Sequence, residues 1–194
     1  MALPLISAVV LIGKDVDQNL LNNSLKSLFW CDEMIKIDTT RIKGSFSEWR
    51  DEGLKKAKGK WILYVDTDEE VSSSLRDEII QLINKPVNQN KAYAVPRKNI
   101  IFDQEFKHGG QWPDYQKRFF VKSSLKKWIG DLHEEPEFEG KLKHLKNPII
   151  HHKNISITEM IEKTNKWSEI ESNLLFKSNH PRMNFIRFLS VALR

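Results

Sequence analysis

Five largely apolar residues run directly into a group of carboxylates in the stretch Trp61-Ile62-Leu63-Tyr64-Val65-Asp66-Thr67-Asp68-Glu69-Glu70. The apolar half predicts a short, buried β-strand. The strand would deliver Asp66 and Asp68 to the edge of a sheet, and open α/β sheets bind ligands at the carboxyl ends of their strands. Because a hard divalent cation relieves the repulsion between clustered carboxylates, the stretch indicates a metal site for a phosphate-bearing ligand. An acidic loop that caps the next helix is the alternative interpretation.

The composition is that of one globular domain with a sizeable core. Of 194 residues, 40% are hydrophobic and 29% are charged. The single cysteine, Cys31, excludes an internal disulfide and fits a reducing compartment, and no signal peptide is apparent, so we expect a cytoplasmic protein. The net charge of +5 favours anionic partners such as nucleotide phosphates or a membrane surface. The basic residues are scattered, which argues against a nucleic-acid-binding module.

Strand and helix patterns alternate through the first half of the chain. Apolar runs predict strands, and 3.6-residue spacing predicts helices, with Ser47 as the N-cap of the second helix. This β-α-β order predicts an α/β fold with a mostly parallel sheet. The second half predicts further strands, one of them antiparallel, and a long amphipathic helix. The expected strands are 5–12, 34–37, 61–65, 92–96, 98–102, 116–121 and the region around 149–150, and the expected helices are 17–29, 47–58, 74–84 and 157–176.

An ordered series of motifs resembles family 2 glycosyltransferases, and more narrowly their lipopolysaccharide-core β-glucosyltransferase branch. The resemblance extends over residues 5–175. It is carried by Ser7-Ala8-Val9-Val10-Leu11-Ile12 with Lys14-Asp15, Ser27-Leu28-Phe29-Trp30-Cys31-Asp32-Glu33, Phe46-Ser47-Glu48-Trp49-Arg50-Asp51-Glu52-Gly53-Leu54, Asp66-Thr67-Asp68-Glu69-Glu70, Gly109-Gly110 through Pro113-Asp114, Arg118-Phe119-Phe120 and His133-Glu134.

The resemblance implies a GT-A fold, the Rossmann-like fold of nucleotide-diphospho-sugar transferases. Its mostly parallel central sheet would be joined by a small antiparallel acceptor-side part and C-terminal helices. We expect a GT-A domain at 1–155, with a nucleotide-binding half at about 1–85 and an acceptor-side half at about 86–155. Residues 156–194 would form a helical extension. Its basic, apolar end at 182–194 is expected to be a truncated segment that contacts the inner face of the membrane.

The activity implied by the resemblance is an inverting sugar transfer. The donor would be a nucleotide-sugar such as a UDP-hexose, and the acceptor a hydroxyl of a lipid-linked or cell-surface glycan such as lipopolysaccharide core. Mg²⁺ or Mn²⁺ held by Asp68, with Asp66 nearer the ribose or reaching the metal through water, would neutralise the diphosphate leaving group. The nucleotide-sugar contacts implied are Lys14, Asp15, Asp38, Arg50 and Asp66.

An inverting transfer also needs a base for the acceptor hydroxyl. The resemblance places Glu134 in that role, with Asp114 and Glu135 as alternatives. His133 would orient Glu134, bind the metal or contact phosphate. The expected acceptor or sugar contacts are Gly109, Gly110, Trp112 and Arg118.

Simpler interpretations of several of these residues stay open. Lys14 and Asp15 would otherwise cap a helix, and the Gly109-Gly110 loop would be ordinary turn chemistry. Because adjacent residues of a strand face opposite ways, His151 and His152 are interpreted as packing residues and not as a metal pair.

The chain departs from the family pattern after Asp38. Residues 39–45 leave no room for a helix that the family carries there, beside the nucleoside. The alternative function is therefore a catalytically impaired glycosyltransferase-like binding or scaffold protein. A haloacid-dehalogenase-type phosphatase also places Asp-x-Asp at a strand end, but Glu70 stands where that motif requires Thr or Val.

Overall fold

The computed structural model describes residues 5–86, 89–130, 134–153 and 156–177, together with residues 181, 184, 185 and 189. The chain divides into two compact units, Met1–Ile155 and Ser156–Arg194. Most of the helix expected at 182–194 lies outside the described residues. No helix in the described part combines the length and the apolarity needed to cross a membrane.

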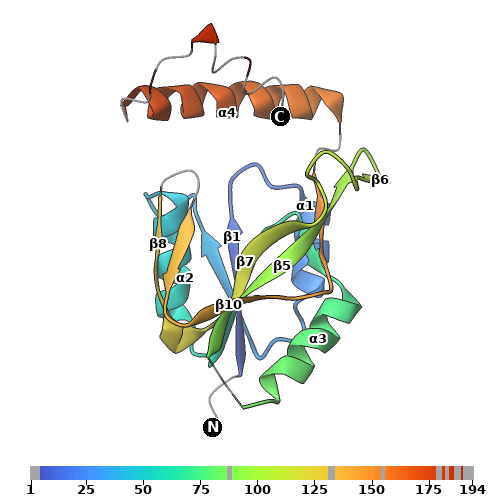
Figure 1. Cartoon of the computed structure of the whole chain (residues 1–194), viewed down its shortest axis with the longest axis vertical. Coiled ribbons are helices and arrows are strands. Elements are labelled where there is room, and N and C mark those ends of the chain that lie inside the picture. The colour runs from blue at the N-terminus through green and yellow to red at the C-terminus, as the bar shows by residue number, and fades with distance from the viewer. Residues whose placement is uncertain are drawn as a thin grey trace. The chain divides into compact units, whose positions relative to one another are not determined.

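The first unit is a mixed α/β structure, and the second contains the helix α4, Ile157–Lys177 (Figure 1). In chain order, the helices and strands of the first unit are β1 Ile6–Ile12, α1 Gln18–Lys26, β2 Glu33–Asp38, α2 Phe46–Lys56, β3 Trp61–Val65, β4 Glu69–Val71, α3 Ser73–Ile83, β5 Asn90–Ile101, β6 Gln104–Glu105, β7 Asp114–Val121, a 3₁₀ turn Lys122–Ser124, β8 Leu125–Ile129, β9 Glu135–Phe138, β10 Lys141–His144 and β11 Ile149–His152.

The strands of the described part form one large sheet and one small one. The large sheet has the order β2-β1-β3-β7-β5-β11-β4, with β10 and β6 also paired to β5. Its strands β1, β2, β3, β5, β10 and β11 run in one direction, and β4, β6 and β7 run in the other. Strands β8 and β9 form the small antiparallel sheet. The prediction of a mostly parallel central sheet with a small antiparallel part is confirmed.

The apolar run of β3 is continuous because both faces of the sheet are covered. Trp61, Leu63 and Val65 belong to a core that includes residues of α3, whereas Ile62 and Tyr64 belong to a second core on the α2 side. Figure 1 shows α1 and α3 on one side of the sheet, and α2 with β8 on the other. A strand with two buried faces has no polar alternation, as expected for the centre of an α/β sheet.

Two local predictions were wrong. Helix α2 is capped by Ser45 and not by Ser47, because Ser45 and Glu48 form a reciprocal capping box. The two strands expected at 92–96 and 98–102 are one strand, β5, which passes through Pro96. The missing N–H of Pro96 is tolerated because β10 pairs with β5 up to Ala94 and β11 pairs with it from Arg97 onward.

Helix α2 lies unusually close to β1 at Gly53. A Cβ atom at this glycine would stand 2.4 Å from Cγ1 of Val9, a distance that side chains do not tolerate. We therefore expect Gly53→Ala to move α2 away from the sheet and to lower the free energy of unfolding by about 1–3 kcal/mol, measured by urea denaturation.

The control for this substitution is Glu52→Ala on the same helix. Glu52 makes only a partly exposed ion pair with Lys56, so its loss should change stability by less than about 0.5 kcal/mol. Adding Val9→Ala to the Gly53→Ala protein removes the clashing methyl groups and should give a non-additive gain. A strictly additive double variant would contradict the close-approach explanation.

Candidate active site

Asp66 is held between two arginines immediately after β3. Nη2 of Arg50 lies 3.1 Å from Oδ1 of Asp66, and Nη2 of Arg118 contacts Oδ2. Both guanidinium groups are buried, with side chains 5% and 6% exposed. Burial alone would raise the pKa of the Asp66 carboxyl, but the charges of Arg118 and Arg50 hold that pKa well below its usual range. The carboxylate is therefore ionised throughout the physiological range.

Glu69, the first residue of β4, fixes Asp66 and Arg118 in this arrangement. Its side chain is fully buried and accepts a hydrogen bond from the backbone N–H of Asp66 at 3.0 Å. Its other oxygen accepts from Nη2 of Arg118 at 2.9 Å and lies 3.6 Å from Nη1 of Arg97. The Glu69 carboxylate thus binds both the backbone of Asp66 and Arg118, which is a counter-ion of Asp66.

Arg50 reaches the site from α2, one turn before the close contact at Gly53. Its backbone carbonyl accepts a hydrogen bond from the Tyr64 hydroxyl, and its guanidinium lies over the ring of Trp128 at 4.9 Å. Nε donates to Oε1 of Glu134 at 2.8 Å. Oε2 of Glu134 makes no hydrogen bond within the described part of the chain. Arg50 therefore connects Asp66 to the predicted base and fixes one of the two oxygens of that base.

A second set of side-chain contacts extends across β5 toward Asp68. The register pairs Arg97 with Asp114 and Asn99 with His151, and each pair makes a direct contact. Arg97 binds Asp114 with Nε at 2.8 Å, and its charge outweighs burial to lower the pKa of Asp114. Nδ1 of His151 lies 2.6 Å from the side-chain oxygen of Asn99.

The other nitrogen of this imidazole faces Asp68. Nε2 of His151 lies 3.5 Å from Oδ2 of Asp68, whose side chain is 35% exposed. Because Asn99 occupies Nδ1, the ring is held with Nε2 toward the Asp68 carboxylate.

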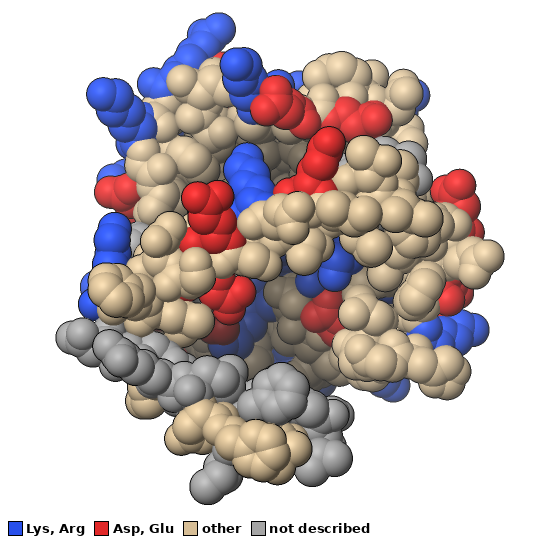
Figure 2. Space-filling view, turned by 90° about the horizontal axis from the view of Figure 1, so that it is seen from above, with Lys and Arg blue, Asp and Glu red and all other residues tan. Residues whose placement is uncertain are grey.

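A pocket of about 300 Å³ opens beside the cluster. Its walls include Arg50, Asp66, Arg97, Arg118, Glu134 and Tyr115. Arg118 lies on the wall of this pocket, and its buried Nε has no hydrogen-bond partner among the described residues. Among the described residues on the face shown in Figure 2, basic and acidic side chains are interspersed and form no patch of one sign. The pocket therefore presents arginine guanidinium groups, which can donate paired hydrogen bonds, next to carboxylates. This combination suits a ligand that carries both phosphate and hydroxyl groups.

The predicted site residues fall into two groups. Arg50, Asp66, Asp114, Arg118 and Glu134 belong to one continuous network, with Asp68 at its edge. Glu135 also lines the pocket, where it pairs with Lys117. The other predicted residues lie elsewhere or are not described, and they are treated in the next paragraphs.

Lys14 and Asp15 follow the carboxyl end of β1, and Asp38 is the last residue of β2. Lys14 and Asp15 are exposed, and Asp38 accepts hydrogen bonds from Thr40 and pairs with Arg41. None of the three contacts the Asp66 network in the described structure. The segment 39–45 joins β2 to α2 without a helix, as the sequence indicates.

The glycine loop lies at the rim of the sheet. Gly109 and Gly110 have positive φ angles of 64° and 74°, Trp112 is 37% exposed, and Gln111 accepts a hydrogen bond from Asn99 through its carbonyl. His133 lies outside the described residues, so its expected role stays a prediction.

Four members of the network were not singled out from the sequence: Glu69, Arg97, Asn99 and His151. His151 was interpreted as a packing residue, and it is buried, but it also contacts Asp68. The available signal is the two-residue spacing of Arg97 and Asn99, which places both side chains on one face of β5. That spacing predicts a shared face, whereas the partners across the strands depend on the sheet order.

The described residues contain no group of three or more His, Cys, Asp or Glu side chains placed to hold a metal ion. Asp68 and His151 nevertheless offer a carboxylate oxygen and an imidazole nitrogen close together. Mg²⁺ sites in phosphate-binding proteins commonly use one or two carboxylates and take the remaining ligands from substrate phosphates and water. The donor set therefore fits a cation that binds together with a diphosphate.

The network predicts a specific stability effect at Glu69. Replacing this carboxylate with the amide in Glu69→Gln leaves Arg118 with one carboxylate partner fewer in a buried position. We expect a loss of about 3 kcal/mol in the free energy of unfolding, measured by chemical denaturation. The matched control is the neighbouring Glu70→Gln, since Glu70 makes a partly exposed contact with His152 and should cost less than about 1 kcal/mol. Equal losses in the two variants would show that the buried network does not stabilise the fold.

Comparisons with known proteins place these observations in context. No family model matches the chain. An uncharacterized glycosyltransferase of Rickettsia felis (strain ATCC VR-1525 / URRWXCal2) is 26% identical over 136 residues, which cover 64% of this chain and 48% of the relative. The chain thus spans about half the length of this relative.

Among solved structures, residues 1–349 of S. aureus TarS align with a TM-score of 0.53 at 12% identity, covering 76% of this chain and 60% of TarS. The same TarS fragment in complex with UDP-GlcNAc aligns with a TM-score of 0.52 at 12% identity, covering 77% and 58%. The predicted GT-A fold is confirmed by this likeness, and the chain is glycosyltransferase-like in sequence and fold.

Proposed function

We propose that this protein is an inverting family 2 glycosyltransferase that moves a hexose from a UDP-sugar to a hydroxyl of a lipid-linked or cell-surface glycan, such as lipopolysaccharide core. The observation that carries the proposal is the network in which Arg50 joins Asp66 to Glu134 beside an open pocket at the carboxyl edge of the sheet. The GT-A fold and the UDP-GlcNAc complex of the structural neighbour support a nucleotide-sugar as the ligand.

The charge balance of the site supports a divalent cation as part of donor binding. Three guanidinium groups, those of Arg50, Arg97 and Arg118, pair with the carboxylates of Asp66, Glu69, Asp114 and Glu134. The Asp68 carboxylate lies at the edge of this network beside His151. The site carries more negative than positive charge before any ligand binds, so a diphosphate entering alone would be repelled. We propose that Mg²⁺ or Mn²⁺ accompanies the donor and is held by Asp68 and His151, with Asp66 on the nucleotide side. The cation would stabilise the charge that develops on the leaving diphosphate.

The residues of this chain have distinct roles in the proposed transfer. Glu134 accepts the proton of the acceptor hydroxyl while that oxygen bonds to the anomeric carbon and the bond to the diphosphate breaks. Arg50 orients Glu134 through Oε1 and leaves Oε2 for the acceptor. Arg118 holds Asp66 and lines the pocket, and Trp112 with the Gly109-Gly110 loop would meet the acceptor glycan at the rim. Lys14, Asp15 and Asp38 would contact the nucleoside beyond β1 and β2.

The place of action follows from the proposed acceptor. We propose that the protein works in the cytoplasm, in peripheral contact with the inner leaflet where lipid-linked acceptors reside.

A second candidate function rests on the short connection after Asp38. Because residues 39–45 form no helix and Asp38 is engaged by Thr40 and Arg41, the nucleoside side of the site is sparse. A glycosyltransferase-like binding or scaffold protein would bind a donor or a glycan without turning it over. The two functions differ in turnover, which the second experiment below measures.

The metal proposal predicts nucleotide binding that depends on Mn²⁺. Calorimetry with UDP-GlcNAc should show binding in Mn²⁺ and its loss in excess chelator. Asp68→Asn should weaken Mn²⁺-dependent binding by more than about tenfold, because it removes a charged ligand of the cation. Asp103→Asn, at an exposed position of the β5–β6 turn, is the matched control and should bind as the unmodified protein does. Equal binding with and without chelator would refute the metal role.

The base assignment predicts a separation of binding from turnover. Glu134→Gln should bind the donor normally and should lower the release of UDP from a panel of UDP-sugars by about 10²–10⁴-fold, since the amide cannot accept the proton. Water serves as the acceptor in this assay, so the natural acceptor need not be known. Glu137→Gln, at an exposed position of β9 paired with Lys127, is the control.

Three results would change the assignment. Unchanged turnover in Glu134→Gln would remove Glu134 from the base role, and a loss in Asp114→Asn alone would place the role on that residue. Donor binding without UDP release for any sugar of the panel would favour the binding-protein alternative.

A further inference from the structure

Strand β7 contains one extra residue, Arg118, relative to its neighbour β5. Tyr93 of β5 pairs with Phe119 of β7. The next residue of β5, Ala94, pairs with Lys117, so Arg118 has no partner on β5. Such a β-bulge shifts the alternation of side chains along its strand, and bulges are frequent beside active sites. The bulge therefore determines which residues of β7 face the candidate active site.

Beyond the bulge, β7 turns Tyr115 toward the α2 side of the sheet. Ala92 of β5 pairs with Phe120, and both belong to the core on that side. Every second residue of a strand shares a face, so Pro96 lies on the same face as Ala92, and Tyr115 pairs with Pro96. In a regular strand Tyr115 would face the opposite side. The bulge thus places Tyr115 on the wall of the pocket beside Asp66.

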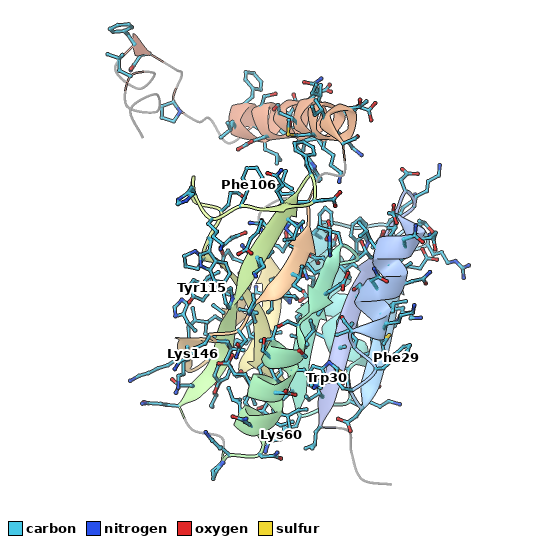
Figure 3. The ribbon with its side chains drawn as sticks, turned by 90° about the vertical axis from the view of Figure 1, so that its right-hand side faces the viewer. Phe29, Trp30, Lys60, Phe106, Tyr115 and Lys146 are labelled. Carbon is cyan, nitrogen blue, oxygen red and sulfur yellow. The ribbon has the colours of Figure 1, made fainter. Side chains whose placement is uncertain are left out.

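The Tyr115 ring is supported by another ring and remains accessible. The imidazole of His144 on β10 packs against it in a T-shaped arrangement, with centroids 4.5 Å apart and an angle of 79° between the planes. Tyr115 is nevertheless 41% exposed. In Figure 3, its side chain lies at the outer surface of the molecule, between the levels of Phe106 and Lys146. An aromatic ring is thus available to a ligand in the pocket.

Polar contacts fix the backbone on both sides of this ring. Oδ2 of Asp114, the first residue of β7, accepts from Nε of Arg97 at 2.8 Å. Oδ1 of Asp114 accepts from the side-chain amide of Gln116 at 2.7 Å. Tyr115 lies between these two connected residues. A ring that is held in place before a ligand arrives reduces the entropic cost of binding.

Tyr115 lies on the side of Asp66 that is remote from the proposed nucleoside contacts. In the sheet, β1 and β2 lie on one side of β3, and β7 lies on the other. The proposed nucleoside contacts are at the ends of β1 and β2, and Asp66 follows β3. Because neighbouring strands are about 4.8 Å apart, a donor that extends from β2 past Asp66 would direct its sugar toward β7. The part of the pocket that Tyr115 and Glu134 line is therefore the acceptor side.

We propose that Tyr115 is the platform on which a pyranose ring of the acceptor glycan stacks. The inference rests on the proposed transferase function, and it names the part of the acceptor that the pocket binds. A pyranose has an apolar face of C–H groups that packs against an aromatic ring. The hydroxyls of the stacked sugar would lie among the polar groups that line the same pocket, which include Glu134 and Lys117. Tyr115 is then a specificity-determining residue, because an acceptor without a flat sugar ring would lose this contact.

The experiment is saturation-transfer-difference NMR of the full chain with the methyl β-glycosides of glucose, galactose and mannose. We expect at least one of them to bind, with the strongest transfer to the C–H protons of one face of its ring. Tyr115→Ala should weaken this binding by about threefold to tenfold, the loss of one aromatic contact, whereas Tyr115→Phe should retain it. Phe29→Ala is the matched control, because it removes an aromatic ring that is 75% exposed and lies outside the pocket.

Other outcomes would overturn the platform or its acceptor role. Equal binding by Tyr115→Ala and the unmodified protein, or no transfer to any of the three glycosides at high millimolar concentration, would refute the platform. A loss in Tyr115→Phe as large as that in Tyr115→Ala would replace stacking with a contact of the hydroxyl. Displacement of the glycoside by UDP with Mn²⁺ would place the sugar on the donor side. Binding through Tyr115 without UDP release from any UDP-sugar would refute the proposed transfer but not the sugar platform.

Discussion

The ion pair of Asp66 with Arg50 and Arg118 joins three elements at the carboxyl edge of the sheet. Asp66 follows β3, Arg50 belongs to α2 on one face, and Arg118 belongs to the antiparallel neighbour β7. Both guanidinium groups are buried, and a buried charge that loses its partner costs several kcal/mol. None of the three side chains can therefore move without the others, and Glu69 adds β4 to the same unit. The pocket beside Asp66 has fixed walls because these charges have fixed partners.

These ion pairs depend on the apolar packing of α2 against β1. Arg50 and Gly53 lie three residues apart on one face of α2, and the missing side chain of Gly53 lets the helix approach Val9 of β1. The approach brings the Arg50 guanidinium over Trp128 and within reach of Asp66 and Glu134. A helix held farther from the sheet would still carry Arg50, but the guanidinium would not reach Asp66 and Glu134. The geometry of the candidate site therefore requires the close packing at Gly53.

The parts of the structure that were predicted correctly are those that depend on local pattern. The apolar run of β3 has the bounds read from the sequence. Arg50, Asp66, Arg118 and Glu134 were named because of the family resemblance and not from a local pattern. The structure brings these side chains into contact, and their roles stay predictions. Pairings that depend on the order of strands were missed. Asn99 meets His151 only because β5 and β11 are neighbours in a particular register, although 52 residues separate the two side chains. Pro96 was taken as a strand end for the same reason, since it is tolerated only where β10 gives way to β11 beside β5.

The two ends of the sheet differ in the charged side chains that they carry. At the carboxyl end, each of the three arginines is paired with a carboxylate, and the carboxylates are in excess. At the other end, Lys85, Lys143 and Lys146 are among the residues that line a separate pocket of about 590 Å³. The carboxylates of that pocket are engaged, Glu78 by the loop after β10 and Asp77 by Arg76. If the proposed donor binds beside Asp66, the excess of carboxylates there would repel its diphosphate, and an accompanying cation would offset that repulsion.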